Sequence, residues 1–168
     1  MRLSLILSTF LLFLSTSCFF SQTISFDLGI DGLTCSQCSK SVEMQLKKLD
    51  FVKTVEMDLA NTRALIRINE TSILSPDAIA KAACNAGFSV RYLKLLTSAE
   101  MKPCLIIAGF DGAINLQNNV TNIADKKVYT ICFLGNSFQS KKELKARKEK
   151  LINNCLENTG KVYFAKVE

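Results

Sequence analysis

The chain has 168 residues, enough for one domain or two small ones, with 21 basic and 15 acidic side chains and a net charge of +6. It contains seven cysteines but no histidine, which excludes Ser-His-Asp and Cys-His catalytic sites, His-ligated haem and mixed Cys/His zinc sites. Any chemistry of this chain is therefore expected to depend on sulfur.

The first 22 residues have the pattern of a secretory signal peptide. Arg2 precedes an apolar run from Leu3 to Leu14, and small polar residues follow. A membrane anchor is disfavoured because this run is shorter than a bilayer span, and no later segment could cross a membrane. We predict that residues 1–22 are removed and that the mature chain is exported to the periplasm or cell envelope. Acylation of Cys18 is an alternative, although Ser15 stands where a bacterial lipoprotein signal usually has an aliphatic residue.

Between residues 23 and 96 the hydrophobic pattern predicts the order βαββαβ, the ferredoxin-like arrangement of an α+β fold. Apolar Ile24 and Phe26 alternate with polar residues at the start of this segment. Further on, Ser75 is the expected cap of a helix that begins with proline, and Gly87 is a typical stop. The expected elements are a strand over 23–30, a helix over 36–49, strands over 52–59 and 64–68, a helix over 75–87 and a strand over 88–95.

The rest of the chain is predicted to form a second small α+β unit over residues 104–168, joined by a polar linker over 97–103. Its residues indicate no family and no site. Asp111 and Gly112 together are a hairpin signal. The expected elements are a strand over 104–110, a second hairpin strand in AINLQ at 113–117, a third strand over 127–134, a helix over 139–157 and a last strand over 161–167.

Basic residues are densest between positions 141 and 150, in the run KKELKARKEK. On a helix these charges spread around most of the circumference, which is typical of a solvated face. Nucleic-acid binding would need basic residues interleaved with exposed aromatic ones, so no nucleic-acid partner is expected.

The ten residues GIDGLTCSQC, at positions 29–38, place Cys35 and Cys38 in a CxxC motif. Together with the following SKSVEMQLKKL, the segment DFVKTVEMDLANTRALIRI and the segment AIAKAACNAGFSV, this motif resembles the heavy-metal-associated domain. That family includes copper chaperones, the N-termini of metal-transporting ATPases and periplasmic mercury-binding proteins. The resemblance covers residues 24–94, less than half of the chain, and assigns residues 23–96 to such a domain. It implies that Cys35 and Cys38 hold one soft metal ion on an exposed loop.

The choice of metal follows from the two thiols. A pair of thiolates favours Cu(I), which tolerates low coordination numbers, whereas zinc usually needs four ligands. Thr34 stands before the first cysteine and offers no carboxylate ligand. Cu(I) is therefore the first expectation, with Hg(II) and Zn(II) behind it. Cys38 is expected in the first turn of a helix capped by Thr34 or Ser36, where the helix dipole and Lys40 would favour the thiolate.

Incomplete coordination on an exposed loop leaves the metal open to attack by thiols of another protein. The resemblance therefore implies metal carriage or sequestration rather than catalysis, with a thiol-bearing donor or acceptor, such as a metal-transporting ATPase, as partner. No catalytic residue and no enzyme activity are predicted. Two alternatives stay open: a thiol-disulfide redox protein that uses Cys35 and Cys38, and an interaction module whose metal site is vestigial.

Three positions depart from or qualify the family pattern. Leu33 replaces the usual methionine and is expected in the core, and Phe51 replaces the usual glycine after the first helix. Phe88 matches an aromatic residue that family members often place near the metal loop, and core packing is an equal alternative for it.

Four further cysteines, Cys84, Cys104, Cys132 and Cys155, form an even set in a chain predicted to be exported. They allow three disulfide connectivities, or they are buried small hydrophobic residues. The second unit is alternatively a degenerate copy of the first, because GFDG at 109–112 resembles GIDG at 29–32. In such a copy, asparagines occupy the positions of the CxxC thiols.

Overall fold

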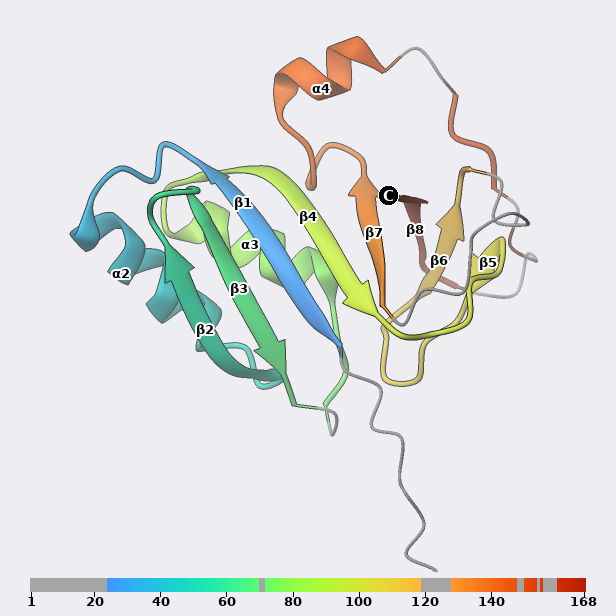
Figure 1. Cartoon of the computed structure of the whole chain (residues 1–168), viewed down its shortest axis with the longest axis horizontal. Coiled ribbons are helices and arrows are strands. Elements are labelled where there is room, and N and C mark those ends of the chain that lie inside the picture. The colour runs from blue at the N-terminus through green and yellow to red at the C-terminus, as the bar shows by residue number, and fades with distance from the viewer. Residues whose placement is uncertain (1–23, 70–71, 119–127, 148–149, 154, 156–159) are drawn as a thin grey trace, which may run out of the picture.

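The computed structural model describes residues 24–69, 72–118, 128–147, 150–153, 155 and 160–168. The predicted signal peptide over residues 1–22, including the alternative acylation site Cys18, lies outside the described residues. Among the described residues, eight strands form one sheet in the order β2-β3-β1-β4-β7-β8-β6-β5 (Figure 1). The strands are β1 (Ser25–Asp31), β2 (Val52–Asp58), β3 (Arg63–Ile68), β4 (Ser89–Thr97), β5 (Cys104–Leu105), β6 (Ala113–Leu116), β7 (Tyr129–Leu134) and β8 (Val162–Val167).

The first four strands and two helices have the predicted order βαββαβ, with α2 (Ser36–Leu46) after β1 and α3 (Pro76–Asn85) after β3. Strand β1 lies between β3 and β4 and is antiparallel to both. A strand in the middle of a sheet has both rows of backbone hydrogen bonds satisfied. The end of β1, from which the CxxC loop departs, is therefore firmly held.

Both helices pack on the same face of this part of the sheet, as Figure 1 shows. Because side chains alternate across a strand, Phe26, Leu28 and Ile30 of β1 all point to that face, and all are fully buried. Val42 of α2 and Ile79 of α3 are fully buried with them. The apolar side chains that the sequence patterns predicted for the strand and for both helices therefore pack together in one core.

The expectation of a separate second unit is not supported, because β7 pairs with β4 and extends the same sheet. The pairing runs antiparallel from Lys94 opposite Cys132 to Thr97 opposite Tyr129. One core cluster includes side chains of both halves of the chain. The physical reason is that β4 would otherwise be an open edge of the first unit, and a strand with apolar Ile131 and Phe133 covers it. Such a pairing between distant segments leaves no local signal in the sequence.

Part of the predicted linker over residues 97–103 is packed into the core. Thr97 is fully buried, its hydroxyl accepts a hydrogen bond from the backbone N–H of Ala99 at 3.1 Å, and Ala99 is buried too. A second link joins Leu74 and Phe110 in a parallel bridge. The two halves therefore meet along β4 and again before α3.

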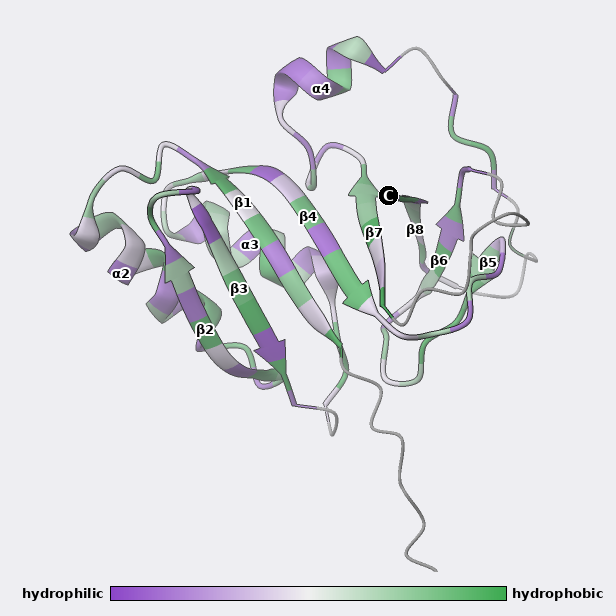
Figure 2. Ribbon diagram, in the orientation of Figure 1, coloured by the Kyte–Doolittle hydropathy of each residue, from purple (hydrophilic) through white to green (hydrophobic). Residues whose placement is uncertain are grey.

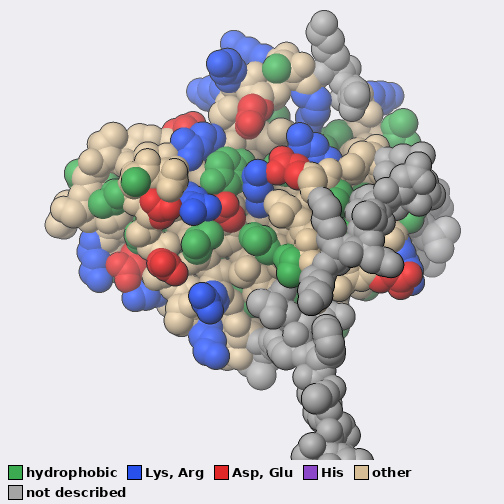
Figure 3. All heavy atoms as spheres, viewed as in Figure 1, with side chains coloured by type: hydrophobic (Ala, Val, Ile, Leu, Met, Phe, Trp, Pro, Cys, Tyr) green, Lys and Arg blue, Asp and Glu red, His purple; other side chains and the backbone are tan. Residues whose placement is uncertain are grey.

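The predicted helix over residues 139–157 is wrong in length. Helix α4 spans only Lys141–Ala146, and Arg147 has an extended backbone. Ser140 and Glu143 form a capping box that starts it, but none of its side chains is buried, so no apolar stripe extends it. Figure 2 shows α4 as largely hydrophilic, and Figure 3 shows Lys and Arg side chains gathered over it. The expected solvated face is confirmed for the residues of α4.

The strands of the second half also differ from the prediction. Strand β5 is two residues long instead of seven, and β6 pairs with β8 in parallel, whereas all pairings of β1 to β4 are antiparallel. Asn115, the counterpart of Cys35 in the supposed repeat, is a fully buried strand residue. These differences argue against a degenerate copy of the first half.

Candidate metal centre

The loop that carries the two cysteines leaves the sheet at Asp31 and reverses direction at Gly32. Gly32 has a φ of +80°, in the left-handed region that favours glycine. Leu33 then inserts into the core and is fully buried, as predicted. Rigid β1 on one side and the buried Leu33 on the other therefore fix where Cys35 begins the next helix.

Cys35 itself caps helix α2, in place of the expected Thr34 or Ser36. Its backbone is extended, with φ −131° and ψ 154°, and its Sγ accepts a hydrogen bond from the backbone N–H of Cys38 at 3.0 Å. The Cys35 carbonyl accepts the first helical hydrogen bond, from Ser39, at 3.0 Å. A sulfur at this position faces the unpaired N–H groups and the positive end of the helix dipole, which stabilises negative charge on it.

The structure brings Cys35 and Cys38 together as a disulfide, with 5.1 Å between their Cα atoms. Cys35 is exposed to solvent, and Cys38 is half-buried and packs against the core. A metal ion requires the reduced form, in which both sulfurs can act as thiolates. Reduction would leave two thiols on one turn of an exposed loop.

Lys40, expected to favour the thiolate, is already engaged. Its Nζ lies 3.3 Å from a carboxylate oxygen of Glu43, which Lys47 also contacts. Hydrogen bonds from Lys47 and Lys40 lower the pKa of Glu43. The negative charge of Glu43 offsets the positive charge of Lys40, so the helix N-terminus contributes the clearer electrostatic effect on the sulfurs.

The donor set fits a soft ion of low coordination number. Within the described part of the chain, no group of three or more cysteine, histidine or acidic side chains could hold a metal ion. Two thiolates without further ligands suit Cu(I) or Hg(II), whereas a zinc ion would lack half of its usual ligands.

The aromatic positions that qualify the family pattern lie at different depths. Phe51 is 5% exposed and belongs to the core. Its carbonyl accepts a hydrogen bond from Asn69 at 2.7 Å, so the turn after α2 is tied to the end of β3. Phe88 is half-buried and packs against the same core, which agrees with the packing alternative for this residue.

Sequence reasoning missed a cleft that the second half builds beside the cysteine loop. It measures about 480 Å³ and is lined by Asp31, Cys84 and the start of β4 on one side, and by Ser140, Lys141 and Lys142 on the other. No local pattern could have revealed it, because it depends on how the turn before α4 attaches to β4. Ser140 N–H donates to the Arg91 carbonyl at 3.1 Å and makes this attachment.

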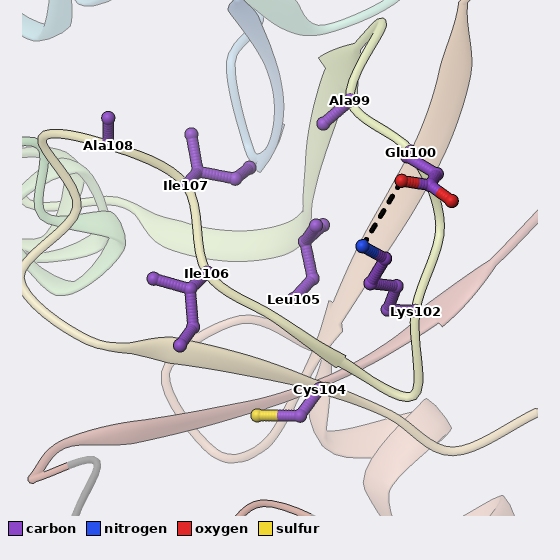
Figure 4. Close-up of a pocket in the computed structure, with 8 residues that line it drawn as sticks. All are labelled: Ala99, Glu100, Lys102, Cys104, Leu105, Ile106, Ile107 and Ala108. Carbon is purple, nitrogen blue, oxygen red and sulfur yellow. Dashed lines mark ion pairs between the residues drawn. The ribbon is translucent and has the colours of Figure 1, made fainter.

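A second depression of about 470 Å³ lies beside β5, an edge strand of the sheet (Figure 4). An ion pair of 3.1 Å between Glu100 and Lys102 spans one side of it, and the side chains of Leu105, Ile106 and Cys104 line the rest. This depression carries no cluster of metal ligands or nucleophiles.

The four other cysteines among the described residues are found in two different states. Cys104 and Cys155 form a disulfide between residues 51 positions apart, whereas Cys84 and Cys132 are free thiols. Cys84 is exposed, and Cys132 is buried. Burial raises the pKa of the Cys132 thiol to about 11, so it is inert near neutral pH. Of the open alternatives, one pair is therefore a disulfide and one cysteine is a buried small residue.

No helix in the described ranges is both long and apolar enough to cross a membrane.

Comparison with known proteins identifies the first half of the fold. Residues 28–89 match the model of the heavy-metal-associated domain. A copper-transporting ATPase of Helicobacter pylori is 38% identical over 60 residues, which are 36% of this chain and 8% of that protein. A probable copper-exporting P-type ATPase of Archaeoglobus fulgidus is 32% identical over 93 residues, which are 52% of this chain and 11% of that protein. The chain thus spans only a small part of the length of these relatives.

Among solved structures, the CopZ metallochaperone aligns with 42% of this chain and 98% of its own, at 24% identity and a TM-score of 0.36. Oxidized MerP from Ralstonia metallidurans CH34 aligns with 42% of this chain and 97% of its own, at 25% identity and a TM-score of 0.37. Residues 28–89, with Cys35 and Cys38 between β1 and α2, are a heavy-metal-associated domain.

Proposed function

We propose that this chain is an exported, non-catalytic protein that carries or sequesters one soft metal ion between the thiolates of Cys35 and Cys38. The observation that carries the proposal is the placement of both cysteines at the N-terminus of α2, on an exposed loop with no third metal ligand grouped with them among the described residues. Cu(I) is the proposed ion, because two thiolates complete a coordination sphere for Cu(I) but not for zinc. The copper-related names of the relatives support the same choice.

The proposed partner is a thiol-bearing protein that gives or receives the ion, such as a metal-transporting ATPase. A metal held by two ligands on an exposed loop can be attacked by incoming thiolates without prior unfolding, and exchange of ligands then moves it from one protein to the other. The Cys35 thiolate, which is exposed, is the first to be displaced, and Cys38, packed against the core, keeps the ion until the partner completes its own site.

Export is part of the proposal and rests on two features. The first 22 residues have the pattern of a signal peptide. In addition, a disulfide such as Cys104–Cys155, between residues 51 positions apart, is typical of proteins in oxidising compartments.

The decisive experiment is a titration of the reduced protein with Cu(I) in competition with a chromophoric chelator. Wild type is expected to withdraw one equivalent of copper, and a Cys35→Ser/Cys38→Ser variant none. Cys84→Ser is the matched control, because it removes an exposed thiol outside the motif and should leave the titration unchanged. Equal copper binding by the double variant and wild type would refute the site.

A thiol-disulfide redox protein is the second candidate, and the disulfide between Cys35 and Cys38 favours it. It predicts that the metal-free protein catalyses reduction or oxidation of a test disulfide, and that the activity is lost when either cysteine is replaced. If neither copper binding nor redox activity is found, the motif is vestigial and the chain acts as an interaction module.

A further inference from the structure

The two disulfides of this protein differ in how an incoming thiol can reach them. Cys35–Cys38 lies on the exposed loop, and its Cys35 side is open to solvent. In Cys104–Cys155, by contrast, Cys104 is half-buried and Cys155 is only 7% exposed. Thiol-disulfide exchange requires a thiolate to approach a sulfur, so access alone favours attack on the first bond.

The segment around Cys155 is also held in place by groups other than its sulfur. The Gln117 side chain donates to the Ile152 carbonyl and accepts from the Ile152 N–H, both at 2.8 Å. Asn153 Oδ1 accepts from the N–H of Cys155 at 3.0 Å and from the side chain of Asn115 at 2.9 Å. Side-chain amides of β6 and of Gln117 just beyond it thus bind this segment much as a neighbouring strand would.

The partner sulfur is fixed by the sheet. Cys104 lies in β5, opposite Asn115 of β6, the same residue that binds Asn153. Both cysteines are therefore positioned by hydrogen bonds that do not depend on the S–S bond. If that bond opens, its two thiols stay side by side, and reclosure is favoured because the fold supplies a high effective concentration of each for the other.

From these observations we propose that the two disulfides have different roles, one structural and one redox-active. Cys104–Cys155 is a permanent fastener of the second half, and Cys35–Cys38 is the one that cycles, so that a thiol reductant opens the CxxC loop while the fastener stays closed. The exchange is an ordinary two-electron step. A reductant thiolate attacks one sulfur of Cys35–Cys38 and forms a mixed disulfide, the other cysteine leaves as thiolate, and a second reductant thiol releases the first. The protein gains two electrons and two protons, and the reductant becomes a disulfide.

The test uses the full oxidised protein and a glutathione series, followed by alkylation and peptide mass mapping of each cysteine. We expect Cys35 and Cys38 to become labelled at a glutathione concentration at least about ten-fold lower than Cys104 and Cys155. Cys84, which is exposed and free, should be labelled in every sample and serves as the internal reference.

A denatured arm separates protection by the fold from intrinsic chemistry. In concentrated guanidinium chloride the resistance of Cys104–Cys155 should be lost, because the Gln117, Asn115 and Asn153 contacts are gone. In the folded state, a Cys35→Ser/Cys38→Ser variant leaves only the fastener, which should keep its resistance to glutathione. This variant tests the fastener without a Cys104→Ser/Cys155→Ser variant, which could fail to fold.

Simultaneous opening of the two disulfides, earlier opening of Cys104–Cys155, or its labelling without reductant would each overturn the proposal. The copper question is separate from this result. At the glutathione concentration that opens only the CxxC loop, the protein should bind Cu(I) with the fastener intact. Absence of copper binding there, with the labelling order as expected, would contradict the proposed metal function and leave the division between the two disulfides standing.

Discussion

The two halves of the sheet are built in different ways. In β1 to β4 all pairings are antiparallel, and two amphipathic helices cover one face. In β5 to β8 the only described helix buries no side chain, and order comes from aromatic contacts, side-chain amides and a disulfide. The first half has its own two helices on one face and presents the cysteine loop, whereas the second half reaches the sheet through the pairing of β7 with β4.

Aromatic side chains mark the line where the halves meet. Phe133 of β7 is fully buried, with its ring 6.4 Å from Phe26 of β1 and 5.4 Å from Phe138. The ring of Tyr163 in β8 meets it edge-on at 5.8 Å. Contacts of this kind contribute free energy beyond the burial of area, so we expect the two halves to unfold together.

The largest expected loss of stability is at the aromatic contact between the two halves. Phe133→Ala should lower the free energy of unfolding by about 3–5 kcal/mol, because it removes a large buried ring and leaves a cavity. Denaturant unfolding followed by circular dichroism measures this loss. Wild type should unfold in one transition, and Ile152→Ala, at a side chain 65% exposed, should change little. Two transitions in wild type would contradict a single core that unfolds cooperatively.

The next largest loss of stability is expected in the first half of the sheet. Leu33→Ala should cost about 2–5 kcal/mol, because Leu33 is fully buried and anchors the cysteine loop. Leu33→Met keeps volume and apolar character and should cost less than about 1.5 kcal/mol. Leu59→Ala, at a side chain 40% exposed, is the matched control. A loss for Leu33→Ala as small as that of the control would show that the loop is not anchored there.

A pH-dependent effect belongs to the second half. Burial raises the pKa of the Cys132 thiol from its ordinary value of 9.0 to about 11. Between these two values the unfolded chain has lost the thiol proton while the folded protein keeps it, so stability falls as pH rises. The free energy of unfolding of wild type should therefore fall by about 1–2 kcal/mol relative to that of Cys132→Ala between pH 9 and 10.5.

Parallel stability curves for wild type and Cys132→Ala over that pH range would contradict the burial of this thiol. Cys84→Ala provides the comparison, because Cys84 is exposed and its replacement should leave the pH dependence as it is in wild type.

The smallest effect is expected at α4. Ser140→Ala removes the cap that accepts from the Glu143 N–H, worth about 1 kcal/mol to the helix itself. Because α4 buries no side chain, the free energy of global unfolding should change by less than about 0.5 kcal/mol. Hydrogen exchange should show the loss at the amides of Leu144 and Arg147, whose N–H groups donate to Ser140 and Glu143. Ser140→Asp keeps a cap and should preserve their protection.

Sequence patterns were reliable where local and tertiary preferences agree. In β1 the alternation of Phe26 and Leu28 with polar residues predicted both the strand and its buried face. The proline after Ser75 predicted the start of α3, and Pro76 begins that helix. The closeness of Cys35 and Cys38 followed from their spacing, since two residues three positions apart at a helix start lie on one turn.

The same patterns failed where distant contacts decide the outcome. The helix predicted over 139–157 includes Ile152 and Cys155. In the structure, Gln117 binds the backbone of Ile152 and Cys104 forms a disulfide with Cys155. Nothing near Cys155 in the sequence indicates that its partner lies 51 positions earlier. Likewise, the sequence predicted that β4 ends the first unit, and it gave no sign that β7 pairs with the free edge of β4.

The sequence alone determined the βαββαβ order and the pair of thiols at the start of α2, because short-range periodicity, capping and motif spacing specify them. Tertiary structure alone decided that β7 continues the sheet, that Cys104 bonds to Cys155, and that a cleft forms between the cysteine loop and α4. The physical reason is that an open strand edge needs a hydrogen-bonding neighbour, a buried ring needs packing partners and a cysteine needs a second sulfur. Segments distant in the sequence supply these partners, so no local pattern specifies them.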